Sequence, residues 1–334
     1  SGTTELLMSD VYFYSKIFSY LFKFFEPSIF LVQSFSISLT LITTVLFYKL
    51  INFYSDNRNI SLIITAIFLF FPAYINYSIL TMREVYIIFF IILMTYSFVQ
   101  IYYKGSVNYI FPYILCFFGI FVLHGGALIG YFFLSFLIGI KLFKQFLIKI
   151  KMKKVDIGVV VIFSLFIFLI VKNILLDSDI SIPYLRDVQV ESIFSIDMTD
   201  INTKINYISN RSPKSSFPRF LIADNNVEFF LLLIPRFIYF QFSPLLMSLP
   251  EPKYAVVLIF DSVVYLFIFY LIIRNHKIIF KDKKYILILI LFLILSFTYM
   301  IGTFNIGQAV RHRIKFLVFL LILLVPIFKE FRKK

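Results

Sequence analysis

The chain has 334 residues, of which 60% are hydrophobic and 15% charged, and its mean hydropathy is +0.92. Soluble domains carry roughly 25% charged residues, so this composition excludes a soluble globular protein and indicates a protein that crosses a membrane several times. The net charge of +14 lies mostly in short loops between apolar segments, which excludes a nucleic-acid-binding surface. The single cysteine, Cys116, excludes a disulfide within the chain and a cysteine metal site.

The apolar segments predict one all-α integral membrane domain over residues 1–334. The chain starts without methionine, and residues 10–26 mix aromatic and charged side chains, as a helix lying in the membrane interface does. Each later apolar run is close to the roughly 20 residues that a helix needs to cross a bilayer, which predicts about nine spans. The predicted spans are 29–49, 60–79, 85–103, 108–123, 125–141, 155–174, 254–273, 285–302 and 314–328.

Two stretches do not fit a simple span. Residues 175–226 are polar and predict one long loop. The apolar run 228–249 is interrupted by several prolines and by Arg236, which predicts a re-entrant or interfacial element. Irregular backbone at membrane depth is tolerated only where protein or a wet cavity covers it.

Lysine-rich loops set the predicted orientation. The segments 141–154, 274–284 and 329–334 are short and basic, and such loops next to membrane spans are cytoplasmic. This orientation places 175–226 outside and requires 228–249 to enter and leave the membrane on the outer side.

With this topology lysine dominates the inner side, whereas most arginines lie outside. Positive charge is disfavoured there, and arginine offers a planar fork that grips phosphate or carboxylate oxygens in pairs. The sequence therefore predicts an outer anion-binding site. The outer arginines are Arg83, Arg186, Arg211, Arg219, Arg236, Arg311 and Arg313.

The stretch 302–316, GTFNIGQAVRHRIKF, concentrates these candidates. Arg311, His312 and Arg313 stand just before the predicted span 314–328, where a helix N-terminus would favour anions over cations. We interpret the triplet as ligand-binding groups on the outer side. The alternative is a cytoplasmic triplet that only orients the chain, which would require the basic loops to lie outside.

Arg83, Glu84 and His124 are candidates in the first half of the chain. Thr81 and Glu84 have the spacing of a capping box, so Glu84 is predicted to cap the helix 85–103. Arg83 either binds an anion at this helix N-terminus or extends to lipid headgroups. His124 is either a chemical group or a hydrogen-bonded structural histidine, because an unpaired polar group at membrane depth is costly.

Other polar residues give weaker signals. An arginine at membrane depth costs about 2.5–3.5 kcal/mol, so Arg236 is expected to contact a partner or a ligand. Asp177 and Asp179 have the D-x-D spacing of a metal-binding pair, although solvated loop carboxylates are the simpler interpretation. No metal site is predicted. Arg211 and Arg219 are further substrate-binding candidates.

Four segments in order resemble the EpsG-like and Wzy-type polysaccharide polymerases of bacterial envelopes. They are MREVYIIFF, VLHGGALIG, IPRFIYFQFSP and GTFNIGQAVRHRIKF, and the resemblance covers residues 10–330. It implies a GT-C-like helical bundle with about ten spans in the full protein, one of them preceding this chain.

The resemblance also implies an activity. Such a protein is a multi-pass glycosyltransferase that polymerises repeat units linked to polyprenyl pyrophosphate at the outer face of the bacterial plasma membrane, without a cofactor. The growing glycan leaves its pyrophosphate and joins a hydroxyl of the incoming unit. Arginines would stabilise the leaving pyrophosphate, and a neutral histidine would take the hydroxyl proton. The pyrophosphate ligands would be Arg236, Arg311 and Arg313, with Arg83 as a weaker candidate. Either His124 or His312 would be the base that accepts the proton. Further substrate-binding candidates are Asn305, Arg211 and Arg219.

The expected partners are the lipid-linked donor and acceptor, the bilayer and a chain-length regulator.

Three other functions remain open from the sequence. A ligase that moves a finished glycan to another acceptor would use the same chemistry. A transporter or flippase of lipid-linked glycans would need basic residues along a transbilayer path, but the spans are nearly free of charge except for Asp261. A membrane O-acyltransferase would use a membrane-embedded histidine but has no clear task for the arginines.

Overall fold

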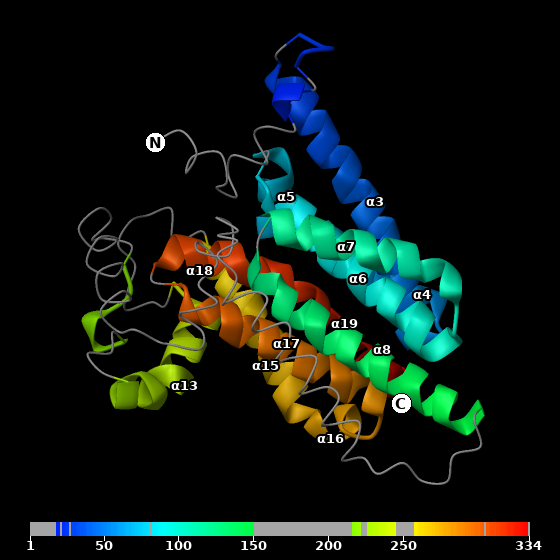
Figure 1. Cartoon of the computed structure of the whole chain (residues 1–334). Coiled ribbons are helices and arrows are strands. Elements are labelled where there is room, and N and C mark those ends of the chain that lie inside the picture. The colour runs from blue at the N-terminus through cyan, green and yellow to red at the C-terminus, as the bar shows by residue number, and fades with distance from the viewer. Residues whose placement is uncertain are drawn as a thin grey trace.

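The computed structural model describes residues 18–20, 22–26, 28–80, 82–123, 125–149, 216–221, 226–244, 257–303 and 305–332. Over these residues the chain is a bundle of helices without strands, apart from one isolated bridge between Ser216 and Asn305 (Figure 1). This confirms the predicted all-α polytopic membrane fold. Several predictions fall outside the described residues: the span 155–174, most of the loop 175–226, His124, Arg211, Asp177 and Asp179.

The first half of the chain forms a group of packed helices. They are α3 (Ile29–Ser55), α4 (Arg58–Leu69), α5 (Pro72–Ile79), α6 (Glu84–Lys104), α7 (Ile110–Leu123) and α8 (Leu128–Lys149). Helix α3 packs against α4 and α6, and α6 packs in turn against α7. Asn57 lies in the turn after α3 and is the N-cap residue of α4. Its side-chain oxygen accepts hydrogen bonds from the backbone N–H groups of Asn59 and Ile60.

The predicted span 60–79 is not one straight helix. Helices α4 and α5 meet at a 56° bend, with Pro72 as the first residue of α5. Proline fits the first turn of a helix but pushes the residue before it out of the helical region. Phe71 is accordingly extended, so the chain turns at this point.

The second half contributes a further set of helices. They are α13 (Asn226–Phe242), α15 (Val263–Arg274), α16 (His276–Ile279), α17 (Lys283–Ile301), α18 (Ile306–Arg313) and α19 (Leu317–Phe331). A π-helical turn, Leu258–Ser262, leads into α15, and a 3-10 turn, Ile314–Phe316, joins α18 to α19.

Helix α19 is the central helix of the described bundle. Residues 317–327 are all buried, and α19 packs against α3, α4, α15, α16 and α17. A helix that is apolar all round has no polar face to turn outward, so the surrounding helices cover it. The uniformly apolar sequence of 316–328 thus produces a core helix inside the membrane domain.

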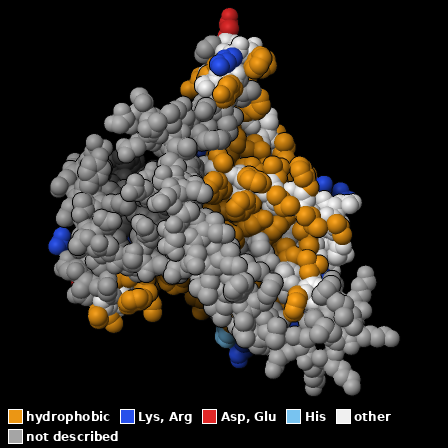
Figure 2. Space-filling view, viewed as in Figure 1, with side chains coloured by type: hydrophobic (Ala, Val, Ile, Leu, Met, Phe, Trp, Pro, Cys, Tyr) orange, Lys and Arg blue, Asp and Glu red, His pale blue; other side chains and the backbone are white. Residues whose placement is uncertain are grey.

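Three described helices, α3, α6 and α17, are long and apolar enough to cross a membrane, and the bent pair α4 and α5 adds a fourth candidate. The 17-residue apolar segment Val107–Leu123 is shorter. Figure 2 shows hydrophobic side chains gathered on the face that carries α3 and α7. On α3 the exposed apolar residues include Phe30, Phe35, Leu41, Ile42 and Val45, which suits a lipid-facing helix.

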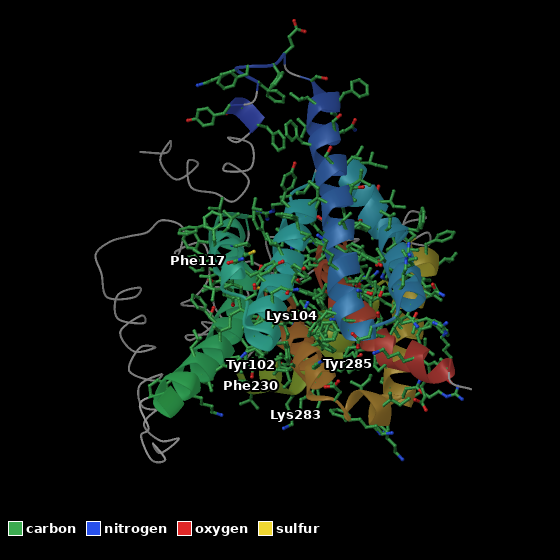
Figure 3. The ribbon with its side chains drawn as sticks, turned by 90° about the vertical axis from the view of Figure 1, so that its right-hand side faces the viewer. Tyr102, Lys104, Phe117, Phe230, Lys283 and Tyr285 are labelled. Carbon is green, nitrogen blue, oxygen red and sulfur yellow. The ribbon has the colours of Figure 1, made fainter. Side chains whose placement is uncertain are left out.

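The predicted cytoplasmic segments meet at one end of the bundle. The Tyr285 hydroxyl, at the start of α17, donates to the Tyr54 carbonyl at the end of α3 over 2.9 Å. The Lys329 ammonium, near the end of α19, donates to the same carbonyl, also over 2.9 Å. Lys104 and Lys283 lie at this end as well (Figure 3). We call this end, formed by the ends of α3, α6 and α19 and the start of α17, the lysine end.

The opposite end of the bundle is formed by the start of α6, the end of α17 and the whole of α18. It carries Arg83, Arg311, Arg313 and Lys315, and we call it the arginine end. Most of the described lysines thus lie toward the lysine end, whereas the arginines are divided: Arg83, Arg311 and Arg313 lie at the opposite end, and Arg58, Arg274 and Arg332 lie at the lysine end.

Candidate functional site

Arg313, at the arginine end, is fully enclosed, with 0% of its surface exposed. Its Nε and Nη2 both contact Asp261 Oδ2, the former over 3.1 Å, and Nη2 lies 3.1 Å from the Ser262 hydroxyl. Its Nη1 donates to the backbone carbonyls of Gln241, over 3.0 Å, and Ser243. Every N–H of the guanidinium is therefore engaged by the chain itself.

The π-helical turn positions this partner set. It places Asp261 and the adjacent Ser262 toward α18 in an otherwise apolar segment. A π turn inside a helix is rare and is often found at functional sites. Tyr265, one turn later, donates from its hydroxyl to the Arg313 carbonyl over 2.8 Å, and its ring lies 5.1 Å from the guanidinium carbon. Arg313 therefore joins α18, α15 and the end of α13.

Arg311 is placed differently. Its Nε forms an ion pair with Glu84 Oε1, and the Arg311 side chain is 35% exposed while that of Glu84 is fully buried. Within the described part of the chain, Arg311 Nη1 and Nη2 have no hydrogen-bond partner. The buried carboxylate holds the guanidinium in place through Nε, and the partly exposed outer fork is not engaged by the described residues.

Two sequence predictions about these residues were wrong. Glu84 does not cap α6: it is the first residue of that helix, Arg83 is the N-cap residue, and no side chain caps this end. Arg311, His312 and Arg313 do not precede a helix N-terminus, because they form the last turn of α18. Cations are favourable at a helix C-terminus, so the helix dipole gives no reason to expect an anion there.

Tyr77, at the end of α5, links the two ion pairs in space. It lies within electrostatic range of Glu84, Asp261, Arg311 and Arg313. It is nearly buried and lies at the same end of the bundle. The structure thus gathers two arginines and two carboxylates, from segments far apart in the sequence, into one charged cluster.

Arg83 ties α6 to α7. Its Nη1 donates to the Leu123 carbonyl at the end of α7 over 3.3 Å. Leu123 immediately precedes His124 in the sequence. Arg83 is adjacent to Glu84 and therefore belongs to the same end of the bundle as Arg311.

Arg236 is 1% exposed and lies on α13, which packs against α18. The ring of Phe229 lies 5.3 Å from its guanidinium carbon, one of the contacts that a cation at membrane depth was expected to make. Helix α13 continues through Pro235 and ends at Phe242, two residues before Pro244. The re-entrant or interfacial placement of 228–249 stays a prediction.

His312 contacts a cation that the sequence analysis overlooked. Lys315 is fully buried, its Nζ lies 3.0 Å from His312 Nδ1, and it also lies 4.7 Å from the ring centroid of Tyr299. A protonated lysine can only donate, so Nδ1 accepts and the ring hydrogen is then on Nε2. The sequence did contain a signal for this contact, because Lys315 is the last residue of RHRIK (311–315). It was counted as part of the predicted span 314–328.

The remaining candidates have local roles in the structure. Asn305 is the N-cap of α18, and its side chain accepts from the Gln308 N–H over 2.7 Å. Its bridge to Ser216 brings the segment 216–221 beside α18. Arg219 is exposed in that segment. The structure thus brings Arg219 to the edge of the arginine end rather than into the buried cluster.

Several buried polar atoms around the two ion pairs have no hydrogen-bond partner in the described chain. They are Glu84 Oε2, Asp261 Oδ1, the Ser243 hydroxyl and both side-chain polar atoms of Gln241. Buried polar groups in native proteins are nearly always satisfied, so these atoms suit water or the hydroxyls of a ligand. The described residues contain no cluster of three His, Cys, Asp or Glu side chains that would suit a metal ion.

An all-α membrane bundle with a charged, hydrogen-bonding cluster at one end defines a polytopic membrane protein. Residues 10–178 match the family model of the dolichyl-phosphate-mannose-protein mannosyltransferases. This match covers half of the chain, which therefore belongs to that family and is a membrane glycosyltransferase of the GT-C type that takes its glycan from a lipid-linked donor. No curated protein and no solved structure matches the chain.

The matched range contains Arg83, Glu84 and His124 but ends before α13, Asp261 and α18. The family match therefore establishes the class of reaction. The roles of Arg236, Arg311 and Arg313 depend on the geometry above.

Proposed function

We propose that this chain polymerises glycan repeat units linked to polyprenyl pyrophosphate, at the outer face of a bacterial plasma membrane. Arg311 carries the proposal. It is a half-buried arginine fixed by a buried carboxylate, and its two outer nitrogens point to no partner in the described chain. A planar guanidinium held in this way is preorganised for a phosphate group.

The proposed reaction has one displacement step. The acceptor hydroxyl oxygen attacks the anomeric carbon of the donor sugar, the bond from that carbon to the pyrophosphate oxygen breaks, and the pyrophosphate leaves with the electron pair. Arg311 stabilises the charge that develops on the leaving oxygen. Arg83 and Arg236 add positive charge at the same end, and Arg313 supports the site through its bonds to Asp261, Gln241 and Ser243.

The histidines take different roles in this proposal. With Nδ1 bonded to Lys315, His312 has its hydrogen on Nε2 and donates to a phosphate oxygen. His124 is then the residue that accepts the proton of the acceptor hydroxyl. It follows Leu123, whose carbonyl Arg83 binds.

An apolar cavity next to Arg83 supports a lipid carrier. It has a volume of about 310 Å³ and is lined by Phe18, Tyr86, Phe90, Leu115, Phe118, Gly119, Val122 and Leu123. Gly119 lets α6 and α7 approach closely, since a Cβ there would lie 2.4 Å from the Phe90 ring. An isoprenoid chain in this cavity would bring its phosphate end toward Arg83.

The test is the length distribution of glycan made by membranes that contain each variant. Arg311→Ala should reduce polymer formation by at least about 100-fold, the scale of losing one preorganised donor to an oxyanion. Arg311→Lys should restore only part of the polymer formation, because the lysine ammonium has the positive charge but not the planar pair of N–H donors of a guanidinium. Arg274→Ala is the matched control: this arginine is exposed at the lysine end and bonds to Tyr270. Full-length polymer from Arg311→Ala would refute the proposal.

The family match favours a second candidate, transfer of a single sugar from a polyprenyl monophosphate, because dolichyl phosphate mannose carries one phosphate. Supplying membranes with labelled donors of each kind separates the two. A ladder of products from the diphosphate donor supports polymerisation, whereas one addition from the monophosphate donor supports the second candidate. One addition of a complete glycan would indicate a ligase.

A further inference from the structure

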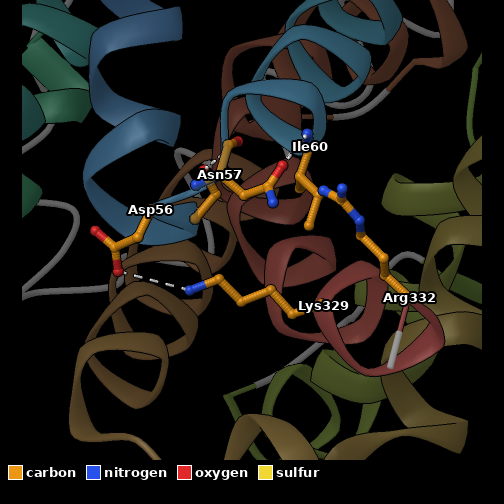
Figure 4. Close-up of a pocket in the computed structure, with 6 residues that line it drawn as sticks. Asp56, Asn57, Ile60, Lys329 and Arg332 are labelled. Carbon is orange, nitrogen blue, oxygen red and sulfur yellow. Dashed lines mark hydrogen bonds and ion pairs between the residues drawn. The ribbon is translucent and has the colours of Figure 1, made fainter. Parts of the chain in front are cut away.

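A separate polar pocket opens at the lysine end, where the turn after α3 meets the end of α19. Its volume is about 390 Å³. The lining residues are Ser55, Asp56, Asn57, Ile60, Lys329 and Arg332. Figure 4 shows the Lys329 side chain extending toward Asp56, with Asn57, Ile60 and Arg332 nearby. None of them belongs to the charged cluster at the arginine end.

The position of the pocket at the end of a candidate membrane span indicates the depth of lipid headgroups. Helix α3 is 27 residues long and qualifies as a membrane span, and the pocket begins directly after its last residue, Ser55. The ends of such helices reach the interfacial region of the bilayer. Leu62 and Ile63 are exposed on α4 just beyond the pocket, and Phe331 is exposed next to Arg332. Acyl chains therefore have apolar surface on both sides of it.

The lining offers donors to an anion. Within the described residues the Arg332 guanidinium has no hydrogen-bond or ion-pair partner, so its fork is available. The Oδ1 of Asn57 is taken by the cap of α4, which leaves the amide nitrogen as a donor. Lys329 lies 3.7 Å from Asp56, but the Asp56 side chain is 84% exposed. A pair this exposed is weak, so Lys329 can turn to a phosphate.

We propose that this pocket binds the phosphate of an anionic phospholipid from the leaflet at the lysine end. Basic pockets between membrane helices are suited to such headgroups. A free phosphate would meet the same donors, but the exposed apolar residues on either side favour a lipid.

The test is native mass spectrometry of the full chain, purified in detergent and titrated with phosphatidylglycerol or with phosphatidylcholine of the same acyl chains. We expect selective retention of phosphatidylglycerol. The variant Lys329→Gln/Arg332→Gln should bind it roughly 30-fold more weakly, since each basic residue near an anionic headgroup contributes about fivefold. Because Lys329 also ties α19 to α3, Arg332→Gln alone is the second variant, with an expected loss of roughly fivefold.

The matched control is Lys277→Gln/Lys281→Gln, which removes two exposed cations of the same end that do not line the pocket. It should retain phosphatidylglycerol like the unsubstituted protein. Equal losses in the control and the pocket variants would overturn the proposal, as would equal binding of the two lipids. Binding of inorganic phosphate as tight as that of phosphatidylglycerol would overturn the assignment to a lipid. These measurements do not depend on glycan transfer.

Discussion

Arg311 and Arg313 stand two residues apart in one helical turn and are held in opposite ways. Arg313 faces the π-helical turn and has all of its donors bonded inside the protein. Arg311 faces the start of α6, uses one nitrogen for Glu84 and leaves the others outward. The first therefore holds helices together, and the second is placed to contact a ligand.

The Arg313–Asp261 pair provides a test of this division. Asp261→Ala would leave a buried guanidinium without its counter-charge, which costs about 3 kcal/mol or more. We expect a clear drop in the thermal unfolding temperature of the purified protein in detergent. The double variant Asp261→Leu/Arg313→Met removes both charges and should recover most of that loss, since a buried ion pair is often no more stabilising than apolar groups of similar size.

An unfolding temperature of Asp261→Ala equal to that of the unsubstituted protein would show that Arg313 does not depend on this carboxylate. A double variant less stable than the single variant would contradict the ion-pair account as well. Neither outcome depends on glycan transfer, which is measured separately on the same variants.

The partners of single residues were the hardest features to predict from the sequence. Glu84 had the spacing of a capping box with Thr81, but its actual partner, Arg311, is 227 residues away. Asp261 is the main charged residue within the predicted membrane spans. A lone carboxylate at membrane depth implies a buried partner. Nothing local indicates that this partner is Arg313. Pairings of this kind are decided by the packing of helices, which the sequence does not display.

The helices themselves were predictable because only a helix satisfies its own backbone in lipid. The predicted spans 85–103 and 285–302 agree with α6 and α17 to within two residues at each end. The bend between α4 and α5 was missed although Pro72 marks it. Helix α13 is the reverse case, because it continues through Pro235 and ends only at Phe242. Proline permits a bend, and neighbouring helices decide whether it is used.

Close packing of α8 against α17 leads to a prediction for the elements. A Cβ on Gly130 would lie 2.8 Å from Leu295 Cδ2, and small residues let membrane helices approach closely. We expect Gly130→Leu to force the helices apart and to lower the thermal unfolding temperature. Gly139, on the same helix, has open space around it and provides the control. A similar decrease with Gly139→Leu would mean that the effect comes from the helix and not from the contact.

For the whole molecule, the position of Arg83, Arg311 and Arg313 at the end opposite the lysine end is the feature on which the proposed function depends. The charge of the short loops predicts that most lysines gather on one side, and the described lysines other than Lys23 and Lys315 lie toward the lysine end. The direction of insertion is a prediction from the same loop charges. If the lysine end is cytoplasmic, the charged cluster faces the side on which lipid-linked glycans would be joined.

Cysteine labelling in intact cells tests this claim most directly. In a Cys116→Ala background, Gly307→Cys places a thiol on the exposed face of α18, where a Cβ meets only Asn305 at 3.5 Å, and Lys281→Cys places one at the lysine end. A membrane-impermeant maleimide should label residue 307 in intact cells and residue 281 only after permeabilisation. Labelling of 281 but not 307 in intact cells would place Arg311 in the cytoplasm and contradict the account.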